Sequence, residues 1–292
     1  MSFVVDSAAR ACLDALDPAI AEDWRILAAN LALRWRSDAP RRVGLAGGQG
    51  AGKSTLSSAI VAAGRHFGLR VVSLSIDDFY LTRSEREALA DRVHPLLATR
   101  GPPGTHDVPL CESVMDALDA DGVVTVPVFD KGLDNRAPQT LNVQAPADIV
   151  LLEGWCVGAR PEPEDRLHPP INALEADSDS QGLWRRHINE ALATDYARLF
   201  GQLDCLIFLR VPNLDAVVRW RLQQESERPH ELRLDEAAVA HFVAHYERLT
   251  RWMLEDVPRR ADVLVELDEE HRVAGCTLVD PPDVSVNVPG KG

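Results

Sequence analysis

The stretch GLAGGQGAGKSTL, residues 44–56, constrains the fold of this chain more than any other part of the sequence. It contains the spacing G-x-x-x-x-G-K-S, whose last three positions are Gly52, Lys53 and Ser54. The apolar run RRVGLAG leads into it, and a helix-forming segment, KSTLSSAIVAAGRHFG, follows. A glycine-rich loop between a buried strand and a helix presents backbone N–H groups and the positive helix N-terminus to phosphate. The sequence therefore predicts a phosphate-binding loop in an α/β fold.

The residues of this loop have distinct expected roles. Its glycines allow a tight turn and a close approach of the backbone to phosphate oxygens. Lys53 is expected to bridge the outer phosphates of a nucleotide, and the Ser54 hydroxyl to ligate Mg²⁺. A chance match is the alternative, and the strand–loop–helix context argues against it. The residues expected to hold the nucleotide phosphates are Gly47, Gly48, Gln49, Gly50, Ala51, Gly52, Lys53, Ser54 and Thr55.

Composition excludes several classes of protein. The formal net charge of −14 over 292 residues disfavours nucleic-acid binding, which depends on Lys and Arg neutralising phosphates. Five scattered cysteines without a C-x-x-C pattern indicate free thiols in a reducing cytosol. No apolar run reaches membrane-span length, and the first twenty residues lack a signal-peptide pattern. We therefore expect a cytoplasmic protein that binds neither nucleic acid nor a membrane, with its oligomeric state left open.

The periodicity of the rest of the chain predicts one α/β domain, with a mostly parallel sheet and helices on both faces. Residues 1–40 are expected to form one or two helices packed on this core, residues 41–280 the domain itself and residues 281–292 a loose tail. The polar, Pro-rich segment 160–181 is expected to be a surface insertion, either a solvated loop or a lid. The further expected strands are 69–76, 123–130, 148–155, 204–211 and 261–267, the expected helices 53–68, 83–93, 110–120, 183–201, 213–226 and 236–255, and the expected loops 94–107 and 131–147.

Acidic residues stand at the ends of two of these strands. Asp77 and Asp78 close the strand LRVVSLSI, which we expect to neighbour the strand of the phosphate loop, and Glu153 ends the apolar run DIVLL. The carboxyl ends of parallel strands face the ligand crevice. Asp77 could there accept a proton from an attacking hydroxyl or help to hold a metal ion, and Glu153 could act on Mg²⁺. Turn or capping aspartates, and an exposed strand-end charge, are the alternatives.

Taken in order, the phosphate loop, SIDDFYLT, HPLLATRGPPGTHD, PVFDK…NRAP and VLLEGW resemble the D-glycerate 3-kinases of the P-loop type. Those enzymes form a group with uridine kinase, phosphoribulokinase and pantothenate kinase that phosphorylates small hydroxylated metabolites. The resemblance covers roughly residues 42–251. It implies an enzyme that uses ATP and Mg²⁺ to phosphorylate a hydroxyl group of a small molecule, with D-glycerate as the first candidate.

The resemblance also implies roles for individual residues. Asp77 would be the base for the acceptor hydroxyl, and the loop from Arg100 to Asp107 would help to form the acceptor pocket. Arg, His and Lys side chains in loops after strands are suited to hold a carboxylate or phosphate, although each alone could be an ordinary surface residue. The residues expected to contact the acceptor are Asp78, Tyr80, Arg100, His106, Asp107, Lys131, Arg136 and Trp155.

Two arginines in VVRWRLQQE, Arg219 and Arg221, are candidates for a lid. In the related kinases an arginine at this place closes over ATP and stabilises charge on the transferred phosphoryl group. Arg221 is the first choice and Arg219 the second. The alternative is a solvated helix face with an i, i+4 pair between Arg221 and Glu225.

Two departures from the family pattern leave the acceptor open. The segment FDKGLDNRAP is shorter than the corresponding stretch of glycerate kinases, and the part after QQESERPH is shortened too. A kinase of the same fold with another acceptor, such as a nucleoside, a pantothenate-like acid, a sugar or a sugar phosphate, is therefore one rival. A nucleotide-dependent switch or ATPase that uses the acidic segment 160–181 as a partner surface is the other.

Overall fold

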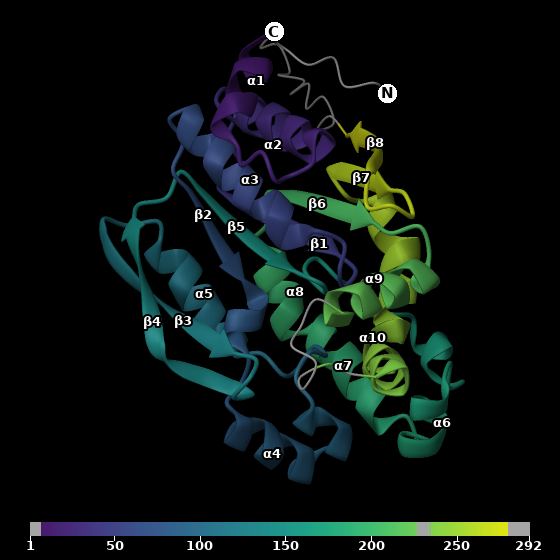
Figure 1. Ribbon diagram of the computed structural model, residues 1–292. Coiled ribbons are helices and arrows are strands. Elements are labelled where there is room, and N and C mark those ends of the chain that lie inside the picture. Colours follow the sequence, from purple (N-terminus) through teal and green to yellow (C-terminus); the bar gives the residue numbers. More distant parts are fainter. Residues whose placement is uncertain (1–6, 227–232, 234, 280–292) are drawn as a thin grey trace, which may run out of the picture.

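The computed structural model describes residues 7–226, 233 and 235–279. Its centre is a six-stranded sheet in the order β2-β5-β1-β6-β7-β8, shown in Figure 1. Five strands are parallel and β8 is antiparallel at one edge. The expected tail at 281–292 lies outside the described residues. The strands are β1 Arg42–Gly47, β2 Val71–Ser75, β5 Ile149–Gly154, β6 Cys205–Arg210, β7 Val263–Leu267 and β8 Val273–Leu278.

Strand β5 lies between β1 and β2 in this sheet. It pairs with β1 on one side and β2 on the other, and all six of its residues are buried. A strand covered on both faces can be apolar throughout, which explains the run Ile149–Leu152. The expectation that β2 adjoins β1 was therefore wrong, because β5 lies between them.

Helices cover both faces of the sheet, as predicted. On one face α2 and α3 pack on alternate residues of the strands, such as Leu45, Leu151 and Ile207. On the other face α5, α8 and α10 pack on the residues between, such as Leu152 and Phe208. Within the described residues, no helix is both long enough and apolar enough to cross a membrane. The α-helices are α1 Ser7–Cys12, α2 Glu22–Trp35, α3 Lys53–His66, α4 Arg83–Arg92, α5 Val108–Ala117, α6 Ala173–Ser178, α7 Leu183–Ala193, α8 Asp195–Phe200, α9 Leu214–Ser226 and α10 Glu236–Asp256.

Three elements differ from the sequence-based expectation. Residues 131–147 were expected to be a loop, but β4 (Asn135–Ala145) pairs with β3 (Gly122–Asp130) in an antiparallel hairpin beside the main sheet (Figure 1). Most of the side chains of β4 are exposed, so its sequence lacks the alternation that marks a half-buried strand. Strand β8 was missed for the same reason. The helix expected at 183–201 is divided at Thr194 into α7 and α8.

The segment 160–181 is folded and partly buried. It contains a 3₁₀ turn, Glu164–Leu167, and helix α6, and it buries Glu162, Leu174 and Glu175. A fully solvated loop, one of the two expected alternatives, does not fit, because ion pairs draw charged groups of the segment into the protein. The other alternative, a lid, stays a prediction. In Figure 1, α6 lies beside α7 and α10.

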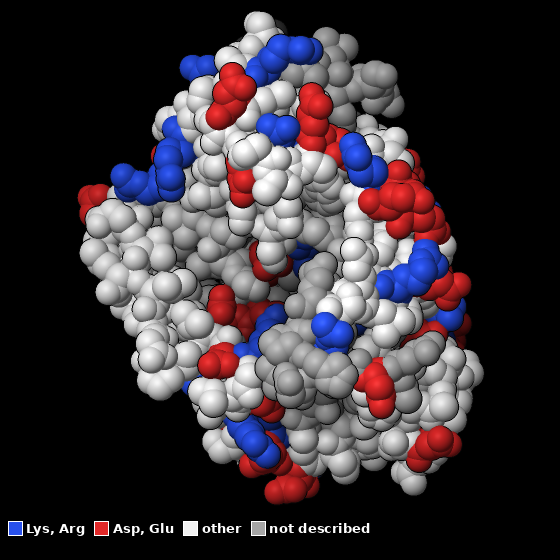
Figure 2. All heavy atoms as spheres, viewed as in Figure 1, with Lys and Arg blue, Asp and Glu red and all other residues white. Residues whose placement is uncertain are grey.

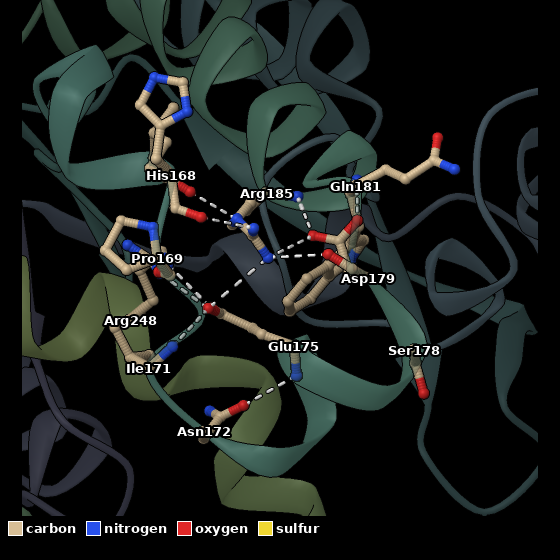
Figure 3. Close-up of polar contacts among 12 residues, drawn as sticks. His168, Pro169, Ile171, Asn172, Glu175, Ser178, Asp179, Gln181, Arg185 and Arg248 are labelled. Carbon is tan, nitrogen blue, oxygen red and sulfur yellow. Dashed lines mark hydrogen bonds and ion pairs between the residues drawn. The ribbon is translucent and has the colours of Figure 1, made fainter.

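An ionic network holds this segment against α7 and α10, as Figure 3 shows. Arg248 on α10 binds the Glu175 carboxylate with two hydrogen bonds of 2.7 Å and reaches Glu162 at 3.1 Å. Arg185 on α7 lies 3.9 Å from Glu175 and 3.2 Å from Asp179. Buried charges are tolerated when they are paired and hydrogen-bonded, and this arrangement meets both conditions. We call Glu162, Glu175, Asp179, Arg185 and Arg248 the ionic network.

Replacing Arg248 with Ala should lower the free energy of unfolding by about 3 kcal/mol, since the buried Glu175 and Glu162 would lose their nearest cation and keep only the more distant Arg185 and Arg166. Arg251→Ala is the matched control on the same helix: Arg251 pairs with Glu247 but its side chain is 56% exposed, so its loss should cost about 0.5 kcal/mol. Urea unfolding followed by circular dichroism measures both. Equal losses in the two variants would show that the network does not stabilise the fold.

Candidate active site

The pairing of three parallel strands brings the candidate residues to one edge of the sheet. Glu153 on β5 lies in register with Leu45 of β1 and with Ser75 of β2. The phosphate loop leaves β1 and Asp77 follows β2 at this edge, where ligands bind in parallel sheets. A cleft of about 380 Å³ opens there, and Figure 2 shows a hollow in which acidic and basic side chains gather.

The phosphate loop ends in the first turn of α3. Gly50 and Gly52 have φ angles of +76° and +87°, which favour glycine, and α3 begins at Lys53. The Lys53 ammonium lies 3.0 Å from the carbonyl oxygens of both Gly47 and Gly48, so its charge stays over the loop. Burial lowers the pKa of Lys53, against the raising effect of Glu153 and Asp77. The loop thus has the form that its sequence predicts.

Residues distant in sequence support the loop. A Cβ atom on Gly52 would lie 2.9 Å from Cη2 of Trp24, which comes from α2. The Trp24 indole N–H donates to the carbonyl oxygen of His271, in the turn between β7 and β8, at 2.9 Å. A second hollow, of about 620 Å³, runs between these residues and Thr55. Neither Trp24 nor His271 was predicted from the sequence, because an isolated Trp and an isolated His carry no local signal for such a role.

Two carboxylates face the start of α3. Glu153 accepts a hydrogen bond from the Ser54 hydroxyl at 3.2 Å. Asp77 lies in a 3₁₀ turn, Ile76–Phe79, directly after β2. Tyr80 donates its phenolic O–H to one oxygen of Asp77 at 2.9 Å, and the Lys131 ammonium lies 2.6 Å from the other. Burial raises the pKa of Asp77, but Lys131 and Tyr80 outweigh it, so that this pKa lies below its usual value.

Asp78 and Trp155 also line the cleft but have structural partners. The Phe129 backbone N–H donates to Asp78 at 3.0 Å, which joins β3 to the turn after β2. Burial raises the pKa of Asp78. The Trp155 indole N–H donates to the Gly101 carbonyl oxygen at 3.1 Å and so holds the loop 100–107 against the end of β5.

Of the cations expected in the acceptor pocket, Arg100 and Lys131 line the cleft. Arg100 forms an ion pair with Asp134 in the turn between β3 and β4, and its guanidinium lies 5.6 Å from the centre of the Phe129 ring. Arg86, which is fully buried, pairs with the same Asp134 at 2.9 Å. The tip of the β3–β4 hairpin is therefore fastened to the wall of the cleft.

The other predicted acceptor residues lie behind the cleft. The His106 ring stacks on Tyr80 at 4.4 Å between centroids, and its Nδ1 lies 2.6 Å from the Tyr196 hydroxyl. Asp107 caps α5 and pairs with Arg136 at 2.8 Å, while Arg136 donates to the Tyr80 carbonyl oxygen at 3.0 Å. These three residues position Tyr80 and do not line the described cleft.

The two candidate lid arginines are separated by the structure. Arg221 lines the cleft, and its guanidinium lies 5.0 Å from the centre of the Phe242 ring. Arg219 forms an ion pair with Glu269 outside the cleft. The side chain of Glu225 is outside the described part, so the alternative, a pair between Arg221 and Glu225, has no structural description. Phe242 and Tyr246 of α10 also line the cleft, and sequence analysis missed them because an amphipathic helix explains both.

Comparison with known proteins finds kinases among the relatives of this chain. No protein-family model matches the chain. The uncharacterized kinase mug58 of Schizosaccharomyces pombe is 36% identical over 224 residues, which cover 71% of this chain and 78% of that protein. The chloroplastic D-glycerate 3-kinase of Arabidopsis thaliana is 28% identical over 222 residues, 71% of this chain and 46% of that protein. The solved D-glycerate 3-kinase of Cryptococcus neoformans has a TM-score of 0.69 at 26% identity and covers 87% of this chain and 97% of its own.

Gly52→Ala should abolish measurable binding of ATP, because the new Cβ meets Trp24 and the residue needs a positive φ. Gly68→Ala is the matched control, since Gly68 has a φ of +79° but no other atom lies within 4 Å of the place that a Cβ would take. That variant should lose about 1 kcal/mol of stability and bind ATP normally. Isothermal titration calorimetry measures the affinities. Similar affinities in both variants would contradict the role of the Gly52–Trp24 contact.

Stability should depend on pH through His106. Burial lowers the pKa of His106 to about 4, against 6.5 for a free histidine, so the unfolded chain binds the proton more readily. The wild type should therefore lose stability as the pH falls from about 6.5 to about 4, by on the order of 3 kcal/mol relative to His106→Asn. Urea unfolding of both proteins across this range measures the difference. Parallel stability curves would show that His106 titrates normally.

Proposed function

The chain belongs to the P-loop kinases of the uridine kinase, phosphoribulokinase and glycerate kinase group, and we propose that it phosphorylates a hydroxyl group of D-glycerate. Phosphorylation of a small molecule by ATP is the activity of the family as a whole. The proposal concerns the acceptor and the roles of the individual residues.

The donor side of the cleft is suited to ATP with Mg²⁺. Lys53 and the N-terminus of α3 would hold the phosphates, and Arg221 of α9 lines the same cleft, where its positive charge would stabilise the transferred phosphoryl group. Mg²⁺ in such sites takes one or two protein oxygens and leaves its other positions to phosphate and water. Ser54 and Glu153, whose oxygens lie 3.2 Å apart, fit this requirement. ATP supplies the phosphoryl group, and Mg²⁺ would neutralise part of its charge.

Asp77 is the residue best placed to take the proton of the acceptor hydroxyl. It lies beside Lys53 and Glu153, at the strand end next to the one that holds Mg²⁺ in this proposal. A carboxylate within hydrogen-bond reach of the attacking hydroxyl is the usual base in phosphoryl transfer. The proton would pass to Asp77 as the acceptor oxygen bonds to phosphorus and ADP leaves. Phosphoryl transfer depends mostly on position and charge, so the cleft needs few other reacting groups.

The observation that carries the choice of acceptor is the pair of cations beside this carboxylate. Lys131 and Arg100 line the same cleft as Asp77 and come from the turn of the β3–β4 hairpin and from the loop 100–107. Cations at this place suit a small acceptor with a carboxylate near its hydroxyl group. Relatives named D-glycerate 3-kinase, in Arabidopsis and in Cryptococcus, support D-glycerate among such acids.

The rival acceptors remain within the same family. A sugar phosphate or a pantothenate-like acid would also use cations, whereas a nucleoside would have less need of them. A switch or ATPase is less well supported, because the buried acids of the segment 160–181, its expected partner surface, already have partners in the ionic network. The matched relatives are named as kinases too.

A screen for ATP consumption tests the proposal. D-glycerate should stimulate ADP formation more than L-glycerate, glycerol, uridine, pantothenate, ribose and ribulose 5-phosphate, and mass spectrometry should identify a phosphoglycerate. The reason is that D-glycerate alone in this set combines a small size, a carboxylate and a hydroxyl in the required configuration. A different phosphorylated product would replace D-glycerate as the acceptor, and stimulation by none would sink the proposal.

Asp77→Asn serves as the control for the mechanism in this screen. It should bind ATP like the wild type but transfer phosphate more slowly by about 10² to 10⁴-fold, because the acceptor hydroxyl loses its base. Activity near that of the wild type would remove Asp77 from the reaction.

A further inference from the structure

Both oxygen atoms of the Asp77 carboxylate are occupied. The Tyr80 hydroxyl donates to Oδ1 at 2.9 Å, and the Lys131 ammonium lies 2.6 Å from Oδ2. An acceptor hydroxyl must donate its proton to one of these oxygens. Each carboxylate oxygen can accept two hydrogen bonds, so these partners fill part of that capacity. The ammonium charge of Lys131 also lowers the pKa of Asp77, and Asp77 becomes a stronger base when Lys131 moves away.

Tyr80 is fixed in its place. Its side chain is buried between the His106 ring, stacked at 4.4 Å, and the Phe129 ring, edge-on at 5.1 Å. Its carbonyl oxygen accepts from Arg136 at 3.0 Å. Displacing Tyr80 would leave a buried hydroxyl without a partner and break this packing, which is costly.

Lys131 can leave at little cost. Its side chain is 60% exposed, and it stands in the turn of the β3–β4 hairpin. Its backbone is held, because the Arg100 guanidinium donates to the Lys131 carbonyl oxygen at 3.4 Å and the tip is fastened through Asp134. Only the ammonium needs to move, and its exposure to water lowers the cost of leaving the half-buried Asp77.

The other cations that line the cleft contact groups other than Asp77. Lys53 lies against the carbonyl oxygens of the phosphate loop, and Arg100 is paired with Asp134. The guanidinium of Arg221, on α9, lies 5.0 Å from the centre of the Phe242 ring, on α10. Among the described cations that line the cleft, Lys131 is therefore the one whose partner is the carboxylate that the proposed reaction requires.

We propose that Lys131 covers Asp77 in the acceptor-free protein, and that the carboxylate of an acidic acceptor draws the ammonium away and uncovers the base. This inference rests on the proposed function, since it takes Asp77 to be that base. An anionic acceptor offers Lys131 a replacement partner, whereas a neutral polyol offers none. The exchange selects hydroxy acids over neutral alcohols of the same size.

The same contact restrains wasteful hydrolysis of ATP. While the ammonium lies on Oδ2, Asp77 is a weaker base toward a water molecule in the acceptor position. Water cannot supply the negative charge that would move Lys131. The base is thus made available together with the molecule that is to be phosphorylated.

The variant Lys131→Met tests the inference, because it removes the cover and the attracting charge together. ATP hydrolysis without any acceptor should rise, by up to about 5-fold for an exposed pair of this strength. The ratio of kcat/KM for D-glycerate to that for glycerol, which lacks the carboxylate, should fall by about 10-fold or more. General damage to the protein would lower both activities, so the opposite changes are specific to the proposed role.

Two controls complete the experiment. Lys131→Arg keeps the charge and should retain most of the preference for the acid. Arg83→Met removes an exposed cation from α4, outside the cleft, and should change neither quantity. Unchanged or lower hydrolysis in Lys131→Met would overturn the inference, even if D-glycerate proves to be the acceptor. If the wild type does not phosphorylate D-glycerate, the proposed acceptor fails, while the hydrolysis measurement still decides the role of Lys131.

Discussion

The parallel pairing of β5 between β1 and β2 is the constraint on which the site depends. It fixes Glu153 beside the phosphate loop on one side and beside the strand end before Asp77 on the other. Each of these groups sits at or directly after a strand terminus, so its backbone cannot shift without disturbing hydrogen bonds of the sheet. The donor side of the cleft is therefore rigid, as expected where catalysis depends mainly on position and preorganised charge.

The acceptor side is built differently. Its walls are the β3–β4 hairpin, the loop 100–107 and helix α10, which lie outside the main sheet and depend largely on side-chain contacts, with backbone hydrogen bonds from the loop to Phe79 and Leu81. Asp134 fastens the hairpin, Trp155 the loop, and the ionic network holds α10 against the segment 160–181. Side-chain contacts of this kind can change by substitution without loss of the fold. This fits a family whose members share one ATP site but phosphorylate different acceptors.

How far the sequence predicts this structure depends on how local each signal is. The phosphate loop, the apolar β5 and the acids at strand ends are contiguous patterns, and their positions were predicted closely. The order of the strands in the sheet was not predicted, because which strands pair depends on burial across the whole sheet and not on a local pattern. Strand β4 was taken for a loop since its side chains face solvent. The contact of Trp24 with the phosphate loop, and the different positions of Arg219 and Arg221 relative to the cleft, depend on residues distant in sequence and were not predicted.

The contact of Trp24 with Gly52 has a consequence for how the chain can be divided. Trp24 belongs to the N-terminal helices and hydrogen-bonds to the turn before β8, near the end of the described chain. Both extremes of the described sequence thus meet at the phosphate loop. A ligand that binds only the folded state adds its binding free energy to folding. A nucleotide bound to this loop would therefore stabilise the packing of both segments against it. A shortened protein that began at β1 would keep the phosphate-loop motif but lose the contact of Trp24 with Gly52.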